Sequence, residues 1–235
     1  MGRRDRAVQK RMSTKMRFGV ITAGIAAALV TAGPVFAASV TSESPLGTAG
    51  VGKAEVSLGD LVADAVRAAV DADVAFVSAS ELRERDTQIP KGKVTTEDVT
   101  PFIAYTDDPV VELRLTGKQI KQALERSVVI YPQKNLGFLQ VSGLRFTFDP
   151  GKPQESRVTA VRTGEKGDKA LSETKSYAVA MTSSMANGAL GYWKIWSKNE
   201  IRRVTETTIP KAVDAFFASR TSINYSNLNR ITVGG

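Results

Sequence analysis

The sequence predicts a mixed α/β fold of the α+β kind, because helix-like and strand-like segments alternate irregularly along the chain. Apolar residues recur with helical spacing over 58–69 and again over 120–128. Residues 144–149 instead alternate strictly between apolar and polar, the pattern of a strand with one buried face. A doubly wound parallel sheet would need a regular strand–helix alternation, which this sequence lacks.

The first helix is expected to begin at Ser57. Its hydroxyl can cap free backbone N–H groups, and Asp60, three residues on, completes a capping pair. Further elements predicted before residue 130 are a buried strand over 74–77, a short helix capped by Thr95 or Thr96 that Pro101 limits or joins, a strand over 110–115, a Thr116-Gly117 turn and a helix over 119–129.

The second half of the domain is predicted to begin with two strands joined at a bend or bulge. An apolar run opens at Gly137, and Ser142-Gly143 interrupts it before the alternating segment. The elements predicted after them are a strand over 158–162, a Gly-Glu-Lys-Gly turn, a strand over 176–181, and a last helix that starts at Pro210 after Thr208.

The amino-terminal end has the pattern of an export signal. The chain has a formal net charge of +8 over 235 residues, and residues 1–37 hold seven Lys or Arg and one Asp. A basic segment, an apolar stretch and a small-residue cleavage pattern near Ala37 predict a signal peptide over 1–37, with an uncleaved anchor as the alternative. Translation from Met12 or Met16 stays open. We expect a secreted, periplasmic or cell-surface protein that contacts a membrane only if the leader is kept.

Residues 38–52 are rich in Ser, Thr, Gly and Pro and have no apolar period, so we expect a linker there and one domain over 53–235. Because most of the excess positive charge lies in the leader, the domain has no strong field for polyanions, and no nucleic-acid partner is expected. The absence of cysteine excludes thiol catalysis and disulfides.

Several segments together resemble the C-terminal domain family of 5′-nucleotidases. The main one is Phe-Leu-Gln-Val-Ser-Gly at 138–143; it is joined in order by similar motifs at 58–65, 110–125 and 186–192, and by the Arg230-Ile231 ending. The resemblance implies a four-layer α/β/β/α fold that holds the nucleoside part of a nucleotide. It also implies that the chemistry of the family belongs to a separate metallophosphoesterase domain.

The resemblance places one group of candidate substrate-binding residues after the strand at 74–77. The family's Asn-Gly-Gly-Gly-Ile-Arg loop matches residues 78–83, so Ser78 takes its first position and Arg83 keeps the arginine that points at the substrate. A local surface salt bridge between Arg83 and Glu81, Glu84 or Asp86 is the alternative.

A second group corresponds to two phenylalanines that cover the faces of the base in the family. Thr106 stands at one of them, with Tyr105 beside it, and Ser184 stands at the other. Loss of both rings would weaken base stacking by about 2–6 kcal/mol, unless the Tyr105 ring turns toward the ligand and replaces one of them. The alternative interpretation of Tyr105 is a partly buried loop tyrosine. Asn187 is retained, but it is expected to shape its turn, and the family's aspartate is replaced by Leu190.

The chain has no histidine, which excludes Ser-His-Asp catalysis and a histidine-built metal centre. Acidic groups such as Asp107-Asp108 and 81–86 are expected to be solvated charged loops. We therefore expect no catalytic residue, metal or cofactor, and a binding or accessory module that is inactive alone. Its possible partners are a nucleoside or nucleotide and a separate metallophosphoesterase chain.

Two other functions stay open. The chain could act as a nucleotide hydrolase, with or without that separate metallophosphatase chain. Alternatively, it could be a diverged surface interaction domain in which Trp193 and Trp196 form an exposed aromatic patch, unless these two rings pack against the sheet.

Overall fold

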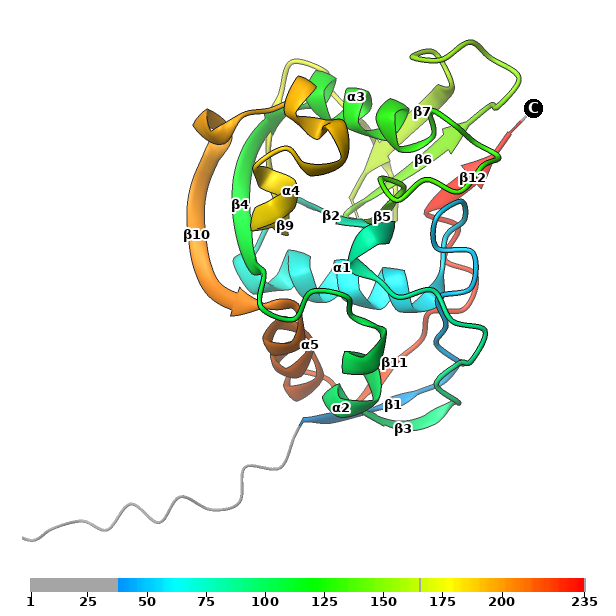
Figure 1. Ribbon diagram of the computed structural model, residues 1–235, viewed down its shortest axis with the longest axis vertical. Coiled ribbons are helices and arrows are strands. Elements are labelled where there is room, and N and C mark those ends of the chain that lie inside the picture. Colours follow the sequence, from blue (N-terminus) through cyan, green and yellow to red (C-terminus); the bar gives the residue numbers. More distant parts are fainter. Residues whose placement is uncertain (1–37, 165, 235) are drawn as a thin grey trace, which may run out of the picture. The chain divides into compact units, whose positions relative to one another are not determined.

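The computed structural model describes residues 38–164 and 166–234, and the predicted leader lies outside the described residues. The mixed α/β prediction is confirmed: helices and three sheets share one core (Figure 1). The three longest helices are α1 (Ser57–Val70), α3 (Gly117–Ser127) and α5 (Ile209–Ala218). Short helical turns are α2 (Thr96–Val99), η1 (Ala79–Glu81), η2 (Thr100–Phe102), α4 (Ser183–Ala186), η3 (Ala189–Lys194) and η4 (Lys198–Glu200).

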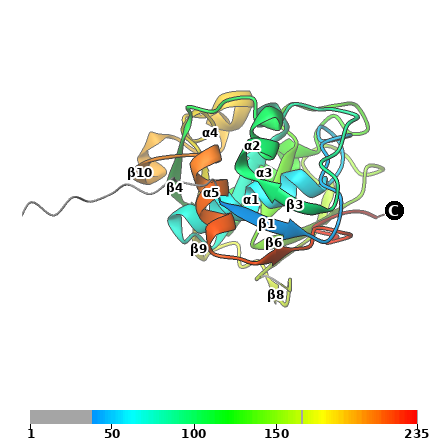
Figure 2. The ribbon, with the colours of Figure 1, turned by 90° about the horizontal axis from the view of Figure 1, so that it is seen from below.

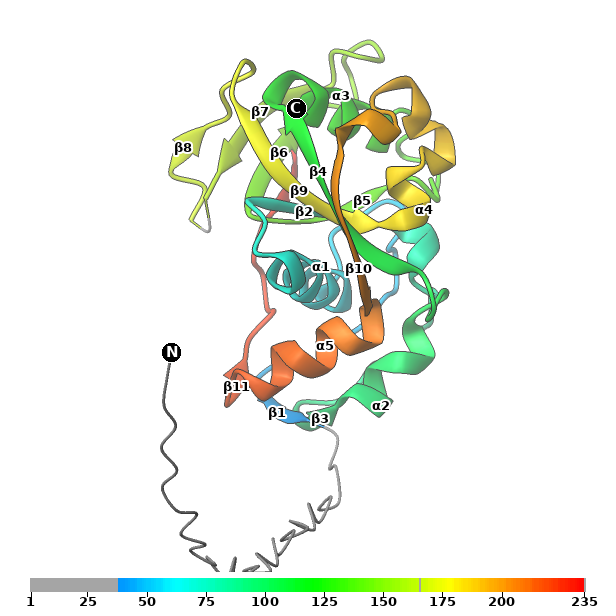
Figure 3. The same ribbon diagram turned by 90° about the vertical axis from the view of Figure 1, so that its left-hand side faces the viewer.

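The largest sheet has five strands in the order β10-β4-β9-β2-β5. Its pairs are antiparallel except for β2 and β9, which run parallel. Strand β2 is buried along its whole length because helix α1 covers it, and α5 packs on the other side of α1 (Figure 3). The strands are β2 (Val74–Ser78), β4 (Pro109–Thr116), β5 (Leu139–Ser142), β9 (Ser176–Thr182) and β10 (Ile201–Thr208).

Two smaller sheets complete the fold. One has the order β12-β6-β7-β8 and lies beside α3; the other has the order β11-β1-β3 and lies beside α5 and α2. Their strands are β1 (Ser39–Ser42), β3 (Gly92–Thr95), β6 (Leu144–Phe148), β7 (Val158–Thr163), β8 (Lys169–Ala170), β11 (Ser222–Ile223) and β12 (Ile231–Val233). No helix in the described part of the chain is long and apolar enough to cross a membrane.

The segment over 38–52, expected to be a linker, is part of the folded unit. Its strand β1 pairs with β3 and with β11, as Figure 2 shows for β1 and β3. Val40, Leu46 and Val51 belong to the core. The expectation failed because β1 is short and rich in Ser and Thr. Its apolar contacts come from partners far away in the sequence.

The start of α1 also differs from the expected cap. Val56 is the N-cap residue, and no side chain caps this end. Instead, the Ser57 hydroxyl accepts a hydrogen bond from the Gly47 N–H (3.0 Å), and Asp60 is buried, 1% exposed, near Arg230. The capping pair is therefore wrong, because tertiary contacts recruit both side chains. The predicted cap at Thr95 agrees with the structure, and the last helix, expected to start at Pro210, begins one residue earlier, at Ile209, with Thr208 as its N-cap residue.

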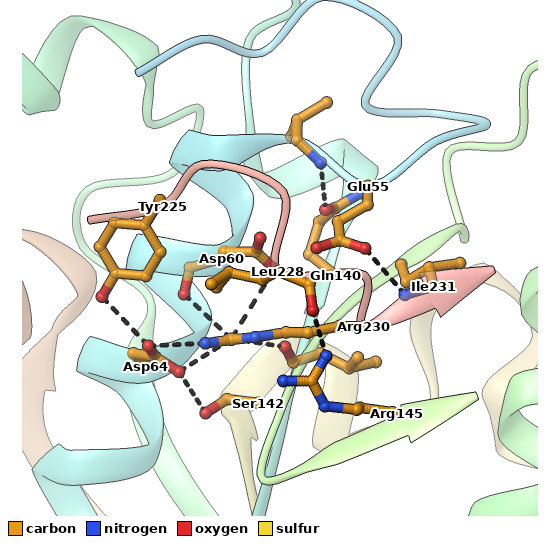
Figure 4. A network of polar contacts seen from close by, with 12 residues as sticks. Glu55, Asp60, Asp64, Gln140, Ser142, Arg145, Tyr225, Leu228, Arg230 and Ile231 are labelled. Carbon is orange, nitrogen blue, oxygen red and sulfur yellow. Dashed lines mark hydrogen bonds and ion pairs between the residues drawn. The ribbon is translucent and has the colours of Figure 1, made fainter. Parts of the chain in front are cut away.

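A partly buried polar network links Arg230 to helix α1 (Figure 4). Arg230 makes two hydrogen bonds to the Asp64 carboxylate, both 2.8 Å long. Asp64 also accepts hydrogen bonds from the hydroxyls of Ser142 (2.5 Å) and Tyr225 (3.0 Å). Because these groups satisfy one another, we interpret the network as structural.

Candidate functional site

An open cleft of about 730 Å³ lies beyond the carboxyl ends of β2 and β9. Such an edge, where parallel strands end, is a common ligand position in α/β sheets. Four segments supply the polar and apolar lining: the end of η1, the loop leading into β4, the segment before β5, and the chain from the end of β9 into η3. The lining residues are Ser80, Glu81, Ala104, Tyr105, Thr106, Asp107, Asp108, Pro109, Leu136, Thr182, Ser184, Met185, Ala189 and Leu190.

Three of the six predicted site residues line this cleft. Tyr105, on the loop before β4, is 57% exposed and lines the cleft. Thr106 and Ser184 also line the cleft, and the Ser184 backbone N–H donates to the Asp108 carboxylate (3.1 Å). The structure thus brings together the two segments that the sequence had placed 78 residues apart.

The other three predicted residues do not line the cleft. Ser78 is buried, and its hydroxyl shares a hydrogen bond with that of Ser80 (2.8 Å). Asn187 ends α4, and its amide donates to the Ser183 carbonyl (2.7 Å), in agreement with the expected turn-shaping role. Arg83 is exposed, and its guanidinium donates to the Pro101 and Ala104 carbonyls, each at 3.4 Å.

Arg83 nevertheless lies next to the cleft, since Ala104 is a lining residue. Within the described residues it makes none of the salt bridges proposed as its alternative role. Glu84 pairs instead with Lys134 (2.8 Å), and Glu81 turns inward.

Glu81 is the feature of the cleft that sequence reasoning missed. It was expected on a solvated loop, but it is 3% exposed, and its Oε2 accepts a hydrogen bond from the Ser78 N–H (2.5 Å). Burial raises the pKa of this carboxyl from 4.5 to about 7, partly opposed by the Thr182 hydroxyl and the Ser78 N–H. The sequence signal that could have indicated its burial is the position of Glu81 just after the fully buried strand β2.

The two tryptophans have different surroundings. Trp193 is 66% exposed, whereas Trp196 is buried and stacks on Tyr192 with ring centroids 4.9 Å apart. The two rings therefore do not form one exposed patch. Gly188, with φ of 90°, makes the turn before Trp193, and a Cβ there would lie 2.5 Å from the Trp193 Cβ.

The cleft contains polar groups but no arrangement suited to a metal. Among residues 38–164 and 166–234, no group of three or more His, Asp, Glu or Cys side chains could hold a metal ion. What the described site can supply is an aromatic rim, an apolar wall and hydrogen-bonding oxygens, which is the composition of a binding site.

Comparison with known proteins agrees with this fold and places the chain in a family. The family model described as "5'-nucleotidase, C-terminal domain" matches residues 35–197. The chain therefore belongs to the 5′-nucleotidase C-terminal domain family.

Two curated relatives are each 31% identical over 59% of this chain: the trifunctional nucleotide phosphoesterase protein YfkN of Bacillus subtilis and an apyrase of Aedes aegypti. This chain spans only 10% and 26% of their respective lengths.

Solved structures give the same result. A 5′-nucleotidase precursor from Thermus thermophilus superposes with a TM-score of 0.72 at 27% identity, covering 83% of this chain and 39% of that one. The NAD nucleotidase of Haemophilus influenzae superposes with a TM-score of 0.70 over 83% of this chain and 38% of its own. At 15% identity, the second match shows the shared fold alone.

Proposed function

We propose that this chain is a ligand-binding module that holds the nucleoside part of a nucleotide in the cleft beside Tyr105. The observation that carries the proposal is the meeting of two segments, 105–109 and 184–190, in the lining of one cleft. These are the segments that the family resemblance assigns to the two faces of a base. The relatives named as nucleotide phosphoesterase and apyrase support a nucleotide-type ligand.

The described residues offer stacking on one face only. Tyr105 supplies an exposed ring, and Leu136, Met185 and Leu190 supply apolar surface. Arg83, next to the rim, is placed to meet an anionic group that extends out of the cleft. We propose that phosphate release requires a metal centre supplied elsewhere, by another domain or by a separate metallophosphoesterase chain.

Titration calorimetry with adenosine, cytidine and AMP tests the binding role. We expect the full chain to bind at least one of them, and Tyr105→Ala to weaken that binding about 5-fold to 150-fold, the range for one base–aromatic stack. Trp193→Ala removes an equally exposed ring outside the cleft and should leave the affinity unchanged. The same preparation should release no phosphate from AMP with added Mn²⁺.

Two results would contradict the proposal. If no nucleoside or nucleotide bound, or if Trp193→Ala removed binding as strongly as Tyr105→Ala, an interaction domain that uses the exposed Trp193 would become the better description. Metal-dependent turnover that purifies with the chain would instead support a hydrolase.

We also propose export, supported by the basic, apolar and small-residue pattern over 1–37. Mass measurement of the mature protein checks this, with Ala38 expected as the first residue. A mass that includes residues 1–37 would support the anchor.

A further inference from the structure

Two buried polar atoms of the cleft make no hydrogen bond of ordinary length and angle to a described residue, although the Thr182 hydroxyl lies near enough to the Glu81 carboxyl to lower its pKa. They are Glu81 Oε1 and Thr182 Oγ1, on side chains that line the cleft and belong to residues only 3% and 1% exposed. Buried polar atoms in folded proteins almost always have a partner, so two without one in the same cleft need an explanation.

The backbone holds both side chains in place. Glu81 ends η1, directly after β2, and its other oxygen, Oε2, is held by the Ser78 N–H at 2.5 Å. Thr182 ends β9, which runs parallel to β2 and pairs with it. Oε1 and Oγ1 therefore stand at the ends of neighbouring parallel strands, on the side of the sheet edge that the cleft occupies.

The charge of the lining indicates which ligand groups fit. Asp107 and Asp108 lie along the same cleft as Glu81, and none of the lining residues in the described chain is Lys or Arg. This surface attracts hydrogen-bond donors and positive charge, and it repels bare acceptors such as carbonyl oxygens.

We infer that Glu81 and Thr182 recognise the edge of a flat heterocycle in which an amino group adjoins an unprotonated ring nitrogen, as in adenine-type and cytosine-type bases. The inference deepens the proposed function and rests on it. The Glu81 oxygen would accept a hydrogen bond from the amino group, and the Thr182 hydroxyl would donate one to the ring nitrogen. Acceptance of a cytosine amino hydrogen by a carboxylate is a known form of base recognition.

Heterocycles that carry a carbonyl in place of the amino group fit these two side chains poorly. Their oxygen would face the Glu81 oxygen, acceptor against acceptor, and their ring N–H would face the Thr182 hydroxyl. Sites built to pair with a polar group reject analogues that lack it, because the buried protein group stays unpaired.

Matched ligand pairs test the inference by titration calorimetry on the full chain at about pH 8.5, above the Glu81 pKa of about 7, where this carboxylate is ionised and can only accept hydrogen bonds. Cytidine and uridine differ at this edge, as do adenosine and inosine. We expect the amino member of each pair to bind about tenfold or more tightly. In Glu81→Gln, whose amide can turn either its oxygen or its nitrogen to the ligand, the ratio should fall to about threefold or less. Thr182→Val should weaken binding of the amino members, and Glu173→Gln, a remote exposed carboxylate, should keep the wild-type ratio.

The outcomes separate the two proposals. Equal binding within each pair, tighter binding of uridine or inosine, or an undiminished ratio in Glu81→Gln overturns the inference but leaves the proposed function intact. If no nucleoside binds at all, the proposed function itself falls, and this inference with it. If a variant does not fold, the comparison of each ligand pair on the wild-type protein still tests the inference.

Discussion

At the scale of single residues, the ionisation of Glu81 affects the folding stability of the whole protein as well as the cleft. Its carboxyl accepts a hydrogen bond from the Ser78 N–H, and burial is the main reason why its pKa rises from 4.5 to about 7. The folded protein therefore holds this proton between about pH 4.5 and 7, whereas the unfolded chain has released it.

This difference makes the folding stability depend on pH. Because the native state binds the extra proton, the free energy of unfolding falls as the pH rises through this window, by about 3 kcal/mol in total. Glu81→Gln cannot titrate, so its stability relative to wild type should increase by that amount between pH 4 and 8. Urea denaturation at several pH values measures this. A constant difference, like that expected for Glu173→Gln, would show that the Glu81 pKa is ordinary.

At the scale of elements, the bend between β5 and β6 depends on Gly143. Its φ of 74° favours glycine, and a Cβ there would lie 2.0 Å from the Asp73 carbonyl oxygen. Gly143→Ala must therefore shift the backbone where β5 leaves the five-stranded sheet.

We expect Gly143→Ala to lower the free energy of unfolding by about 2–5 kcal/mol, the sum of a left-handed alanine and an overpacked contact. Gly52→Ala is the matched control, since a Cβ there meets its nearest atoms at 3.5 Å, an ordinary contact. Denaturant titration compares the two. A loss in Gly143→Ala no larger than in Gly52→Ala would mean that the bend adapts easily.

At the scale of the whole molecule, strand β1 joins the two ends of the folded unit. It lies between β3 and β11, so the start of the described chain pairs with a strand near its end. Val40 is 3% exposed and faces the core, whereas Thr41 on the same strand is exposed.

Val40→Asp should therefore destabilise the protein by about 3 kcal/mol or more, because it buries an unpaired charge. Thr41→Asp places the same charge on the exposed face and should cost far less. Thermal and urea unfolding of both variants checks this. Equal stability of the two would support the original expectation that 38–52 is a linker.

The sequence by itself determined the mixed α/β class, the family and most of the regular elements, because these depend on local periodicity, caps and turn residues. Strand β10 escaped detection because it is an edge strand with little apolar alternation, and β1 because its partners are distant.

Only the tertiary structure decided which polar residues are buried together. Tyr105, Thr106 and Ser184 could be expected near one another from the family pattern, and the structure places them on one cleft. That Glu81 is buried at the same cleft, that Arg83 lies next to the cleft, and that Asp60 lies near Arg230 and caps no helix follow from how the chain folds back on itself. Burial and its effect on charge are properties of that packing, and no local sequence pattern encodes them.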